Sequence, residues 1–173
     1  MPKGNALLCA KVFGCGDLAA MFSLTAKDIL IGTRNVRISA MHSLFNSSSI
    51  VCSFRQENVN LSHMAVTDPH IAVCNTGLGN VTVYNASGDE MFPIGAGQLE
   101  RPWGVFILNE GYVLVTDQRT GRLYKYRLEA DAQPTWVCDN LTWPSGICVD
   151  GGGNILVTSN KAKIIHVISS EGE

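Results

Sequence analysis

Histidines are the side chains in this sequence best suited to metal binding or acid–base catalysis, and their spacing favours neither use. They are His42, His63, His70 and His166. A zinc site needs three or four His, Cys or carboxylate ligands brought together by a fixed spacing, whereas these four fall at different positions of the repeat described below. The chain has no G-x-S-x-G, H-E-x-x-H or phosphate-loop motif. We therefore expect a protein that is not an enzyme and that uses no metal or other cofactor.

A second set of side chains could bind a ligand without changing it. Guanidinium and ammonium groups attract phosphate or carboxylate, and an indole ring stacks on an unpaired base or anchors a protein partner. The candidates are Arg34, Arg37, Arg55, Arg101, Trp103, Arg119, Arg122, Trp143, Lys161 and Lys163. Whether they act together depends on the elements that position them.

A repeat of 42 residues runs through the whole chain. The β-branched runs ILI, IAV, VLV and ILV begin at Ile29, Ile71, Val113 and Ile155, each 42 residues after the one before. A second column at the same spacing holds only small residues, namely Ala20, Ser62, Gly104 and Gly146. Self-similarity at a fixed period of this length is typical of repeat architectures.

Each repeat contains four short strand patterns separated by turn signals such as Asn109–Gly111 and Thr120–Gly121. Four antiparallel strands in about 40–45 residues are typical of a β-propeller blade. The predicted fold is therefore all-β, a propeller of four-stranded blades in which small residues begin the crowded innermost strands. We expect one domain, 1–173, with repeats at roughly 17–56, 59–98, 101–140 and 143–173, the last supplemented by 6–13.

The order of the strand patterns predicts how the ring closes. The chain begins with a fourth-strand pattern, Leu7 to Phe13, and ends after a third, Ile164 to Ile168. Pairing these two strands would complete the last blade and protect two sheet edges from aggregation. The alternative is a fragment of a larger propeller, which would expose both end blades and tend to self-associate.

Two segments, 99–128 and 141–168, resemble NHL repeats, the family pattern being P-x-G-I-x-V-D, a glycine turn and N-I-x-V-x-D. The later segment matches at Pro144, Gly146, Ile147, Val149, Asp150, Asn154, Ile155 and Val157, and the earlier one at Pro102, Gly104, Val113, Val115 and Asp117. The first two repeats lack the proline. Thr33, Asn75 and Ser159 replace the acidic residue that the family has at the end of the second strand.

The resemblance implies a function as well as a fold. NHL propellers form the C-terminal domain of tripartite-motif ubiquitin ligases, where they are recognition platforms for RNA or protein. Ligase activity itself would need a RING domain, and this chain has no such pattern. Related six-bladed families bind metals around the central channel, so a metal-dependent lyase or hydrolase is an alternative.

The propeller topology sorts the charged residues onto two faces. Linkers between blades and turns between second and third strands share one face, where basic residues outnumber acidic ones; acidic residues dominate the other. All ten candidates named above fall on the basic face, although the chain as a whole has a net charge of −2. We expect this face to bind RNA or an acidic protein surface. The alternative is a protein-interaction scaffold that uses the rim or the acidic face.

The cysteines and the hydropathy of the chain suggest in which cellular compartment the protein is located. None of the six cysteines forms a C-x-x-C pair, and most lie in apolar runs such as IAVCN, as buried free thiols do. The sequence has no clear signal peptide and no apolar stretch near the roughly 20 residues that cross a bilayer. We therefore expect a cytoplasmic protein without membrane contact.

Overall fold

The computed structural model describes residues 18–23, 28–33, 37–42, 50–54, 61–67, 69–85, 88–108 and 110–169, with side chains described from residue 61 onward. All regular elements in these ranges are β-strands. None is a helix of the length and apolar character needed to cross a membrane. The predicted strand Leu7 to Phe13 lies outside the described residues, as do Arg34 and Arg55.

The strands form four antiparallel sheets that follow one another along the chain, which confirms the predicted blades. In the described residues, blades 1, 2 and 3 each have four strands in sequence order, and blade 4 has three. Blade 1 contains β1 Leu18–Ser23, β2 Asp28–Thr33, β3 Arg37–His42 and β4 Ile50–Phe54. Blade 2 contains β5 Leu61–Thr67, β6 His70–Asn75, β7 Asn80–Tyr84 and β8 Glu90–Ile94. Blade 3 contains β9 Pro102–Leu108, β10 Tyr112–Asp117, β11 Arg122–Arg127 and β12 Pro134–Cys138, and blade 4 contains β13 Pro144–Val149, β14 Ile155–Ser159 and β15 Ile164–Ile168.

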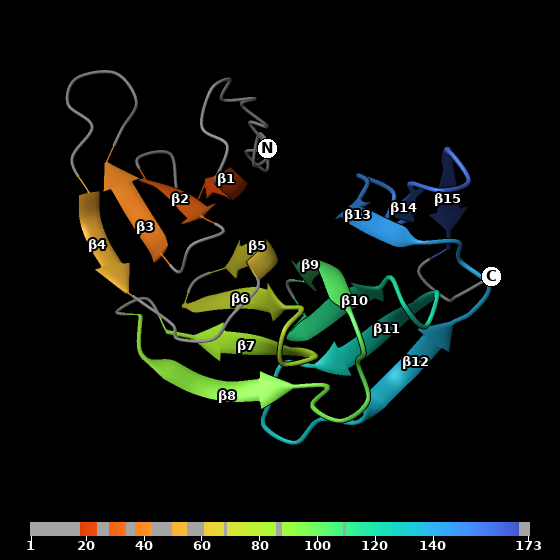
Figure 1. Ribbon diagram of the computed structural model, residues 1–173, viewed down its shortest axis with the longest axis horizontal. Coiled ribbons are helices and arrows are strands. Elements are labelled where there is room, and N and C mark those ends of the chain that lie inside the picture. Colours follow the sequence, from red (N-terminus) through yellow and green to blue (C-terminus); the bar gives the residue numbers. More distant parts are fainter. Residues whose placement is uncertain are drawn as a thin grey trace.

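The blades are arranged around an arc, with the first strand of each blade on the inside (Figure 1). β5 packs against β1 on one side and β9 on the other, and β9 packs against β13. Among the residues whose side chains are described, two hydrophobic cores lie between successive blades rather than within one blade. The core between blades 2 and 3 includes Val81, Val83, Val105 and Val113, and the core between blades 3 and 4 includes Leu123, Ile147 and Val157.

The inner strands approach so closely that the small-residue column is a steric necessity. A Cβ added to Gly104 in β9 would lie 2.0 Å from the Ser145 carbonyl oxygen in β13. In the same column of blade 2, the Ser62 hydroxyl donates to the carbonyls of Pro102 (3.1 Å) and Trp103 (2.9 Å). These contacts give a physical reason for the small residues expected at the start of each inner strand.

Candidate functional site

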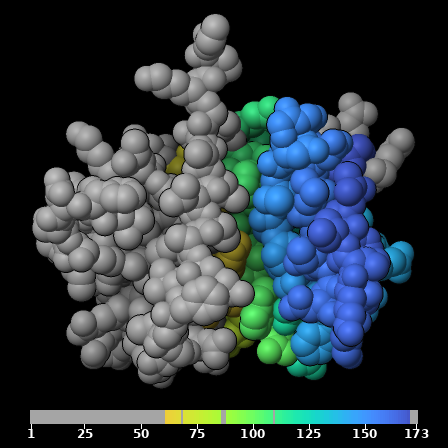
Figure 2. Space-filling model, turned by 90° about the horizontal axis from the view of Figure 1, so that it is seen from above, coloured from red at the N-terminus to blue at the C-terminus, as the bar shows by residue number. Residues whose placement is uncertain are grey.

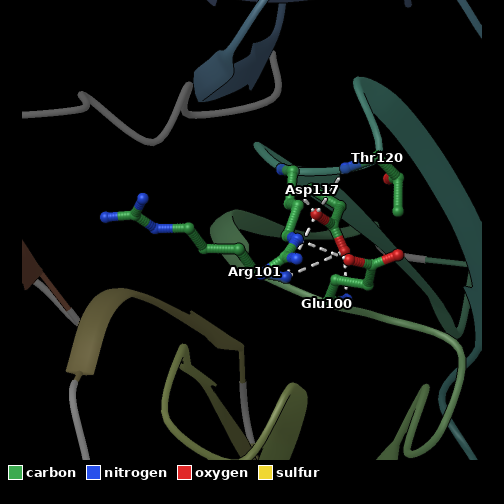
Figure 3. A network of polar contacts seen from close by, with 5 residues as sticks. Glu100, Arg101, Asp117 and Thr120 are labelled. Carbon is green, nitrogen blue, oxygen red and sulfur yellow. Dashed lines mark hydrogen bonds and ion pairs between the residues drawn. The ribbon is translucent and has the colours of Figure 1, made fainter.

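The buried carboxylate of Asp117 organises the basic face of blade 3. Asp117 ends β10 and is fully buried. Its oxygens accept hydrogen bonds from the backbone N–H groups of Arg119 (2.9 Å) and Thr120 (3.2 Å), in the turn that follows β10. They also accept from the N–H groups of Glu100 (2.6 Å) and Arg101 (3.1 Å), in the linker that leads into β9. One side chain therefore joins the linker to the turn (Figure 3).

This network fixes the backbone from which Arg101 projects. The N–H of Gln118 donates to the Arg101 carbonyl oxygen at 3.0 Å, so both polar backbone groups of Arg101 are held. Its side chain extends away from the Asp117 carboxylate, as Figure 3 shows. Because the backbone is held in this way, a ligand that bound the guanidinium would have to order only the side chain of Arg101 and not its backbone.

Four side chains from two blades meet at this point, and we call them the basic–aromatic cluster: Arg101, Trp103, Trp143 and Lys161. The Arg101 guanidinium lies 5.5 Å from the ring centroid of Trp103 and 5.5 Å from that of Trp143. The Lys161 ammonium lies 4.8 Å from the Trp143 ring. These are cation–π distances, and Arg101, Trp143 and Lys161 are all exposed.

Trp143 is held in an unusual backbone conformation. Its φ angle is 53°, in the left-handed region that bulky residues rarely adopt. The chain around it is fixed by two backbone hydrogen bonds, from Asn160 N–H to the Trp143 carbonyl (3.3 Å) and from Leu141 N–H to the Gly121 carbonyl (2.9 Å). Trp143 is nevertheless 38% exposed. A strained backbone that presents a large ring to solvent is the kind of feature found at binding sites.

The other predicted binding residues in the described ranges lie outside the basic–aromatic cluster, and two of them form ion pairs. Arg119 forms an ion pair with Glu100 at 2.7 Å, and Arg122 pairs with Asp139, in both cases between well exposed side chains. Lys163 ends the β14–β15 turn with a φ of 56°, and its N–H donates to the Ser159 carbonyl at 2.8 Å. Arg37 begins β3, in a blade whose side chains are not described.

The sequence contained a signal for this cluster that the face assignment did not use. Arg101 and Trp143 are 42 residues apart, so they occupy the same linker position of successive blades and become neighbours in space. The ion pairs of Arg119 and Arg122 carried no comparable signal, because their partners Glu100 and Asp139 lie in linkers whose path only the structure defines.

The described histidines and cysteines include the partly buried His63 and the buried Cys74. His63 lies at the interface of blades 2 and 3, where its Nδ1 accepts a hydrogen bond from Val105 N–H at 3.3 Å and burial lowers its pKa to about 4. Cys74, Cys138 and Cys148 are free thiols, and burial raises the pKa of Cys74. In the described ranges no group of three or more His, Cys, Asp or Glu side chains could hold a metal ion.

Asp150 holds the turn that follows the strand β13. Its carboxylate accepts hydrogen bonds from the N–H groups of Gly152 (2.8 Å) and Asn154 (2.8 Å). The side-chain amide of Asn154 donates to the second oxygen at 2.9 Å. Both oxygens are thus used to hold the glycine turn between β13 and β14.

Comparison with known proteins identifies the fold. No protein-family model matches the sequence, and no curated protein resembles it in sequence. Among solved structures, a streptogramin B lyase superposes with a TM-score of 0.71 at 16% identity, covering 93% of this chain and 55% of its own. The WD40 β-propeller domain of Doa1 gives a TM-score of 0.70 at 14% identity, covering 87% of this chain and 50% of its own.

A third structure has a similar extent to this chain. The computationally designed Ika4 protein superposes with a TM-score of 0.68 at 11% identity, covering 96% of this chain and 99% of its own. The chain thus has a β-propeller fold that spans about half the length of the lyase and of the Doa1 domain. Identities this low establish the fold alone.

Proposed function

We propose that this propeller is a non-enzymatic recognition module that binds single-stranded RNA through the basic–aromatic cluster. In this proposal the Trp143 ring stacks on an unpaired base, and Arg101 and Lys161 contact the adjacent phosphates. The sequence resemblance to NHL repeats, which form the recognition domains of tripartite-motif proteins, agrees with such a role. Membership of that family is part of this proposal. The cytoplasmic location expected from the sequence also remains a prediction.

The observation that carries this proposal is the position of Arg101 between two indole rings. Its guanidinium is 5.5 Å from both ring centroids, and Lys161 approaches the Trp143 ring from 4.8 Å. Aromatic rings beside cationic groups are the combination used by proteins that bind single-stranded nucleic acid: stacking accepts any base and the cations follow the backbone.

The ion pairs beside the cluster are compatible with phosphate binding. Arg119 and Glu100 are 73% and 54% exposed, so their attraction is screened by solvent. Exposed ion pairs contribute little to stability, about 0–1 kcal/mol. Arg119 and Arg122 can therefore exchange a carboxylate for a phosphate at small cost, which extends the proposed surface along the turn between β10 and β11.

A titration with a short fluorescent single-stranded RNA at two salt concentrations tests the proposal. Removing the ring in Trp143→Ala should weaken binding by about tenfold or more, since stacking contributes about 1–3 kcal/mol per base. Arg101→Ala should weaken binding and also reduce the salt dependence by about 0.7 in the logarithmic slope, because one phosphate contact is lost.

A matched control lies on the same blade. Arg127 is another exposed arginine over an aromatic ring, 5.3 Å from the centroid of Tyr112, and is outside the cluster. Arg127→Ala should leave RNA affinity unchanged. An affinity that does not depend on salt, or that falls equally in the Arg127 and Arg101 variants, would contradict RNA binding at this cluster and favour the alternative of a protein partner on another surface.

A further inference from the structure

Blades 2 and 3 each bury one face against the blade that follows them. In blade 2, Val81 and Val83 in β7 are fully buried in the core shared with blade 3. In blade 3, Leu114 and Leu123 are fully buried in the core shared with blade 4. We call this side of a blade its following face.

The following face of blade 4 carries equivalent residues but is exposed. Ile165 occupies the position of Val81 and Leu123, yet it is 63% exposed, and Val167, equivalent to Val83, is 65% exposed. The pairing of β14 with β15 places both on the same side of the sheet as Leu156 and Thr158. The position of Ile165 is completely buried in blades 2 and 3, whereas that of Val167 is completely buried in blade 2 and holds the partly buried Lys125 in blade 3. Two exposed β-branched side chains at these positions indicate an apolar surface that has no partner among the described residues.

Within the described part of the chain, the side-chain hydrogen bonds from one blade to the inner strand of the next also stop at blade 4. The Thr116 hydroxyl in blade 3 donates to the Ser145 carbonyl of blade 4 at 2.8 Å. Its equivalent, Thr158, instead binds within its own blade, to the Ser145 hydroxyl (2.9 Å) and Gly146 N–H (2.8 Å). Likewise, among the described residues a Cβ on Gly146 would meet only Thr158, whereas one on Gly104 would collide with the next blade.

Blades 1 and 4 lie at the two ends of the arc (Figure 1). β13 packs against β9 and β10, and β1 packs against β2 and β5; the described strands show no extensive packing between β1 and β13. Viewed from above, blade 4 forms one side of the molecule, beside blade 3 (Figure 2).

Blade 1 has the residue types that the exposed face of blade 4 requires. The face of blade 3 that covers blade 2 includes Val105, Val113 and Val115. In blade 1, the equivalent register positions hold Met21, Ile29 and Ile31, with Met21 paired to Ile31 across β1 and β2. The sequence of blade 1 therefore supplies an apolar face of the kind that packs on a following face elsewhere in the molecule.

We propose that the following face of blade 4 binds blade 1 of a second copy of this chain, so that two copies form a reciprocal dimer. The contact continues the packing already present between blades 2, 3 and 4, with Ile165 and Val167 in the roles of Val81 and Val83. Because blade 4 of each copy receives blade 1 of the other, the two contacts close on themselves and no further copy is added. This interface is separate from the basic–aromatic cluster and does not depend on the proposed function.

Light scattering and sedimentation across a range of concentrations test the dimer with the full chain. The wild-type chain should approach twice the chain mass of 18.7 kDa. Ile165→Glu should shift the dimerisation midpoint to higher concentration by at least about tenfold, because a buried charge without a partner is costly. The monomer should keep its circular dichroism spectrum, since Ile165 is solvent-exposed within one chain.

Leu78→Glu is the matched control, because Leu78 is 58% exposed in the turn between β6 and β7, away from the following face of blade 4. It should dimerise like the wild type. A wild-type chain that stays monomeric at high concentration, or open-ended polymers instead of dimers, would overturn the proposal. Equal weakening by Leu78→Glu and Ile165→Glu would overturn it as well.

Mixing two variants identifies blade 1 as the occupant. Ile31→Glu alters the apolar face of blade 1 and leaves blade 4 intact, whereas Ile165→Glu does the reverse. Each variant alone should be mainly monomeric. Their mixture should form dimers through the one unaltered pair of faces. A mixture that remains monomeric under conditions where the wild type dimerises would exclude blade 1 as the occupant.

Discussion

Blades 3 and 4 share a repeat position by position, yet the same positions have different roles in them. Leu123 is fully buried beneath blade 4, whereas its equivalent Ile165 is 63% exposed. Asp117 holds a linker and a turn together, whereas its equivalent Ser159 makes a 3.0 Å contact with His166 in the neighbouring strand. Positions that agree between blades build the propeller, and positions that differ in type or burial are the ones for which we propose contacts with a ligand or a second copy.

The largest expected difference is in the stability lost when the last residue of the second strand is replaced, Asp117 in blade 3 or Ser159 in blade 4. Asp117→Ala would leave several buried N–H groups without an acceptor, and we expect a loss of about 4 kcal/mol in the free energy of unfolding. Ser159→Ala removes a single contact and should cost about 1 kcal/mol. Chemical denaturation followed by circular dichroism measures both values. Equal losses would mean that the Asp117 network does not hold blade 3 together.

The two following faces should also differ, by a somewhat smaller amount. Leu123→Ala leaves a cavity in the core between blades 3 and 4, which should lower the free energy of unfolding by about 3 kcal/mol. Ile165→Ala should cost less than about 1 kcal/mol in dilute protein, where the chain is monomeric. The same denaturation experiment at low protein concentration checks this prediction. A cost for Ile165→Ala that equals the cost for Leu123→Ala would show that the face of blade 4 is covered within the single chain.

The smallest effect is a pH dependence at the interface of blades 2 and 3. Burial lowers the pKa of His63 from 6.5 to about 4 in the folded protein. Between these values the unfolded chain binds a proton that the folded chain does not, so stability falls as the pH falls through this window. The loss should be about 1 kcal/mol between about pH 7 and pH 5.5. His63→Gln should remove this part of the pH dependence, and an identical pH profile for the wild type and variant would contradict it.

Much of the architecture could be predicted from the sequence, because equivalent positions in each repeat face the same packing and steric constraints. The spacing of Ile71, Val113 and Ile155 places each at the same point of the second strand in blades 2, 3 and 4, and the small residue Gly104 reflects a 2.0 Å approach between inner strands. Each strand pattern recurs several times at the same spacing along the chain, so a coincidental resemblance to a strand in one repeat does not mislead the prediction.

The candidate site was only partly predictable. Residues of the cluster could be assigned to one face by topology, but the approach of Arg101 to Trp143 depends on the linker geometry that Asp117 imposes. The exposure of Ile165 could not be inferred either, because a pattern of alternating apolar residues does not say which blade, if any, follows. A periodic sequence predicts the contacts between consecutive blades, but only the structure shows whether the following face of blade 4 is covered.

Hydrogen–deuterium exchange with and without a short single-stranded RNA tests most directly the claim that departures from the repeat form the binding surface. At saturating RNA we expect slower exchange in the linkers at 99–103 and 141–145 and in the turn at 160–163, which carry the cluster. Exchange in the turns on the opposite face, such as 150–154, should not change. Protection confined to that opposite face, or no protection in the three cluster segments at saturation, would contradict the account.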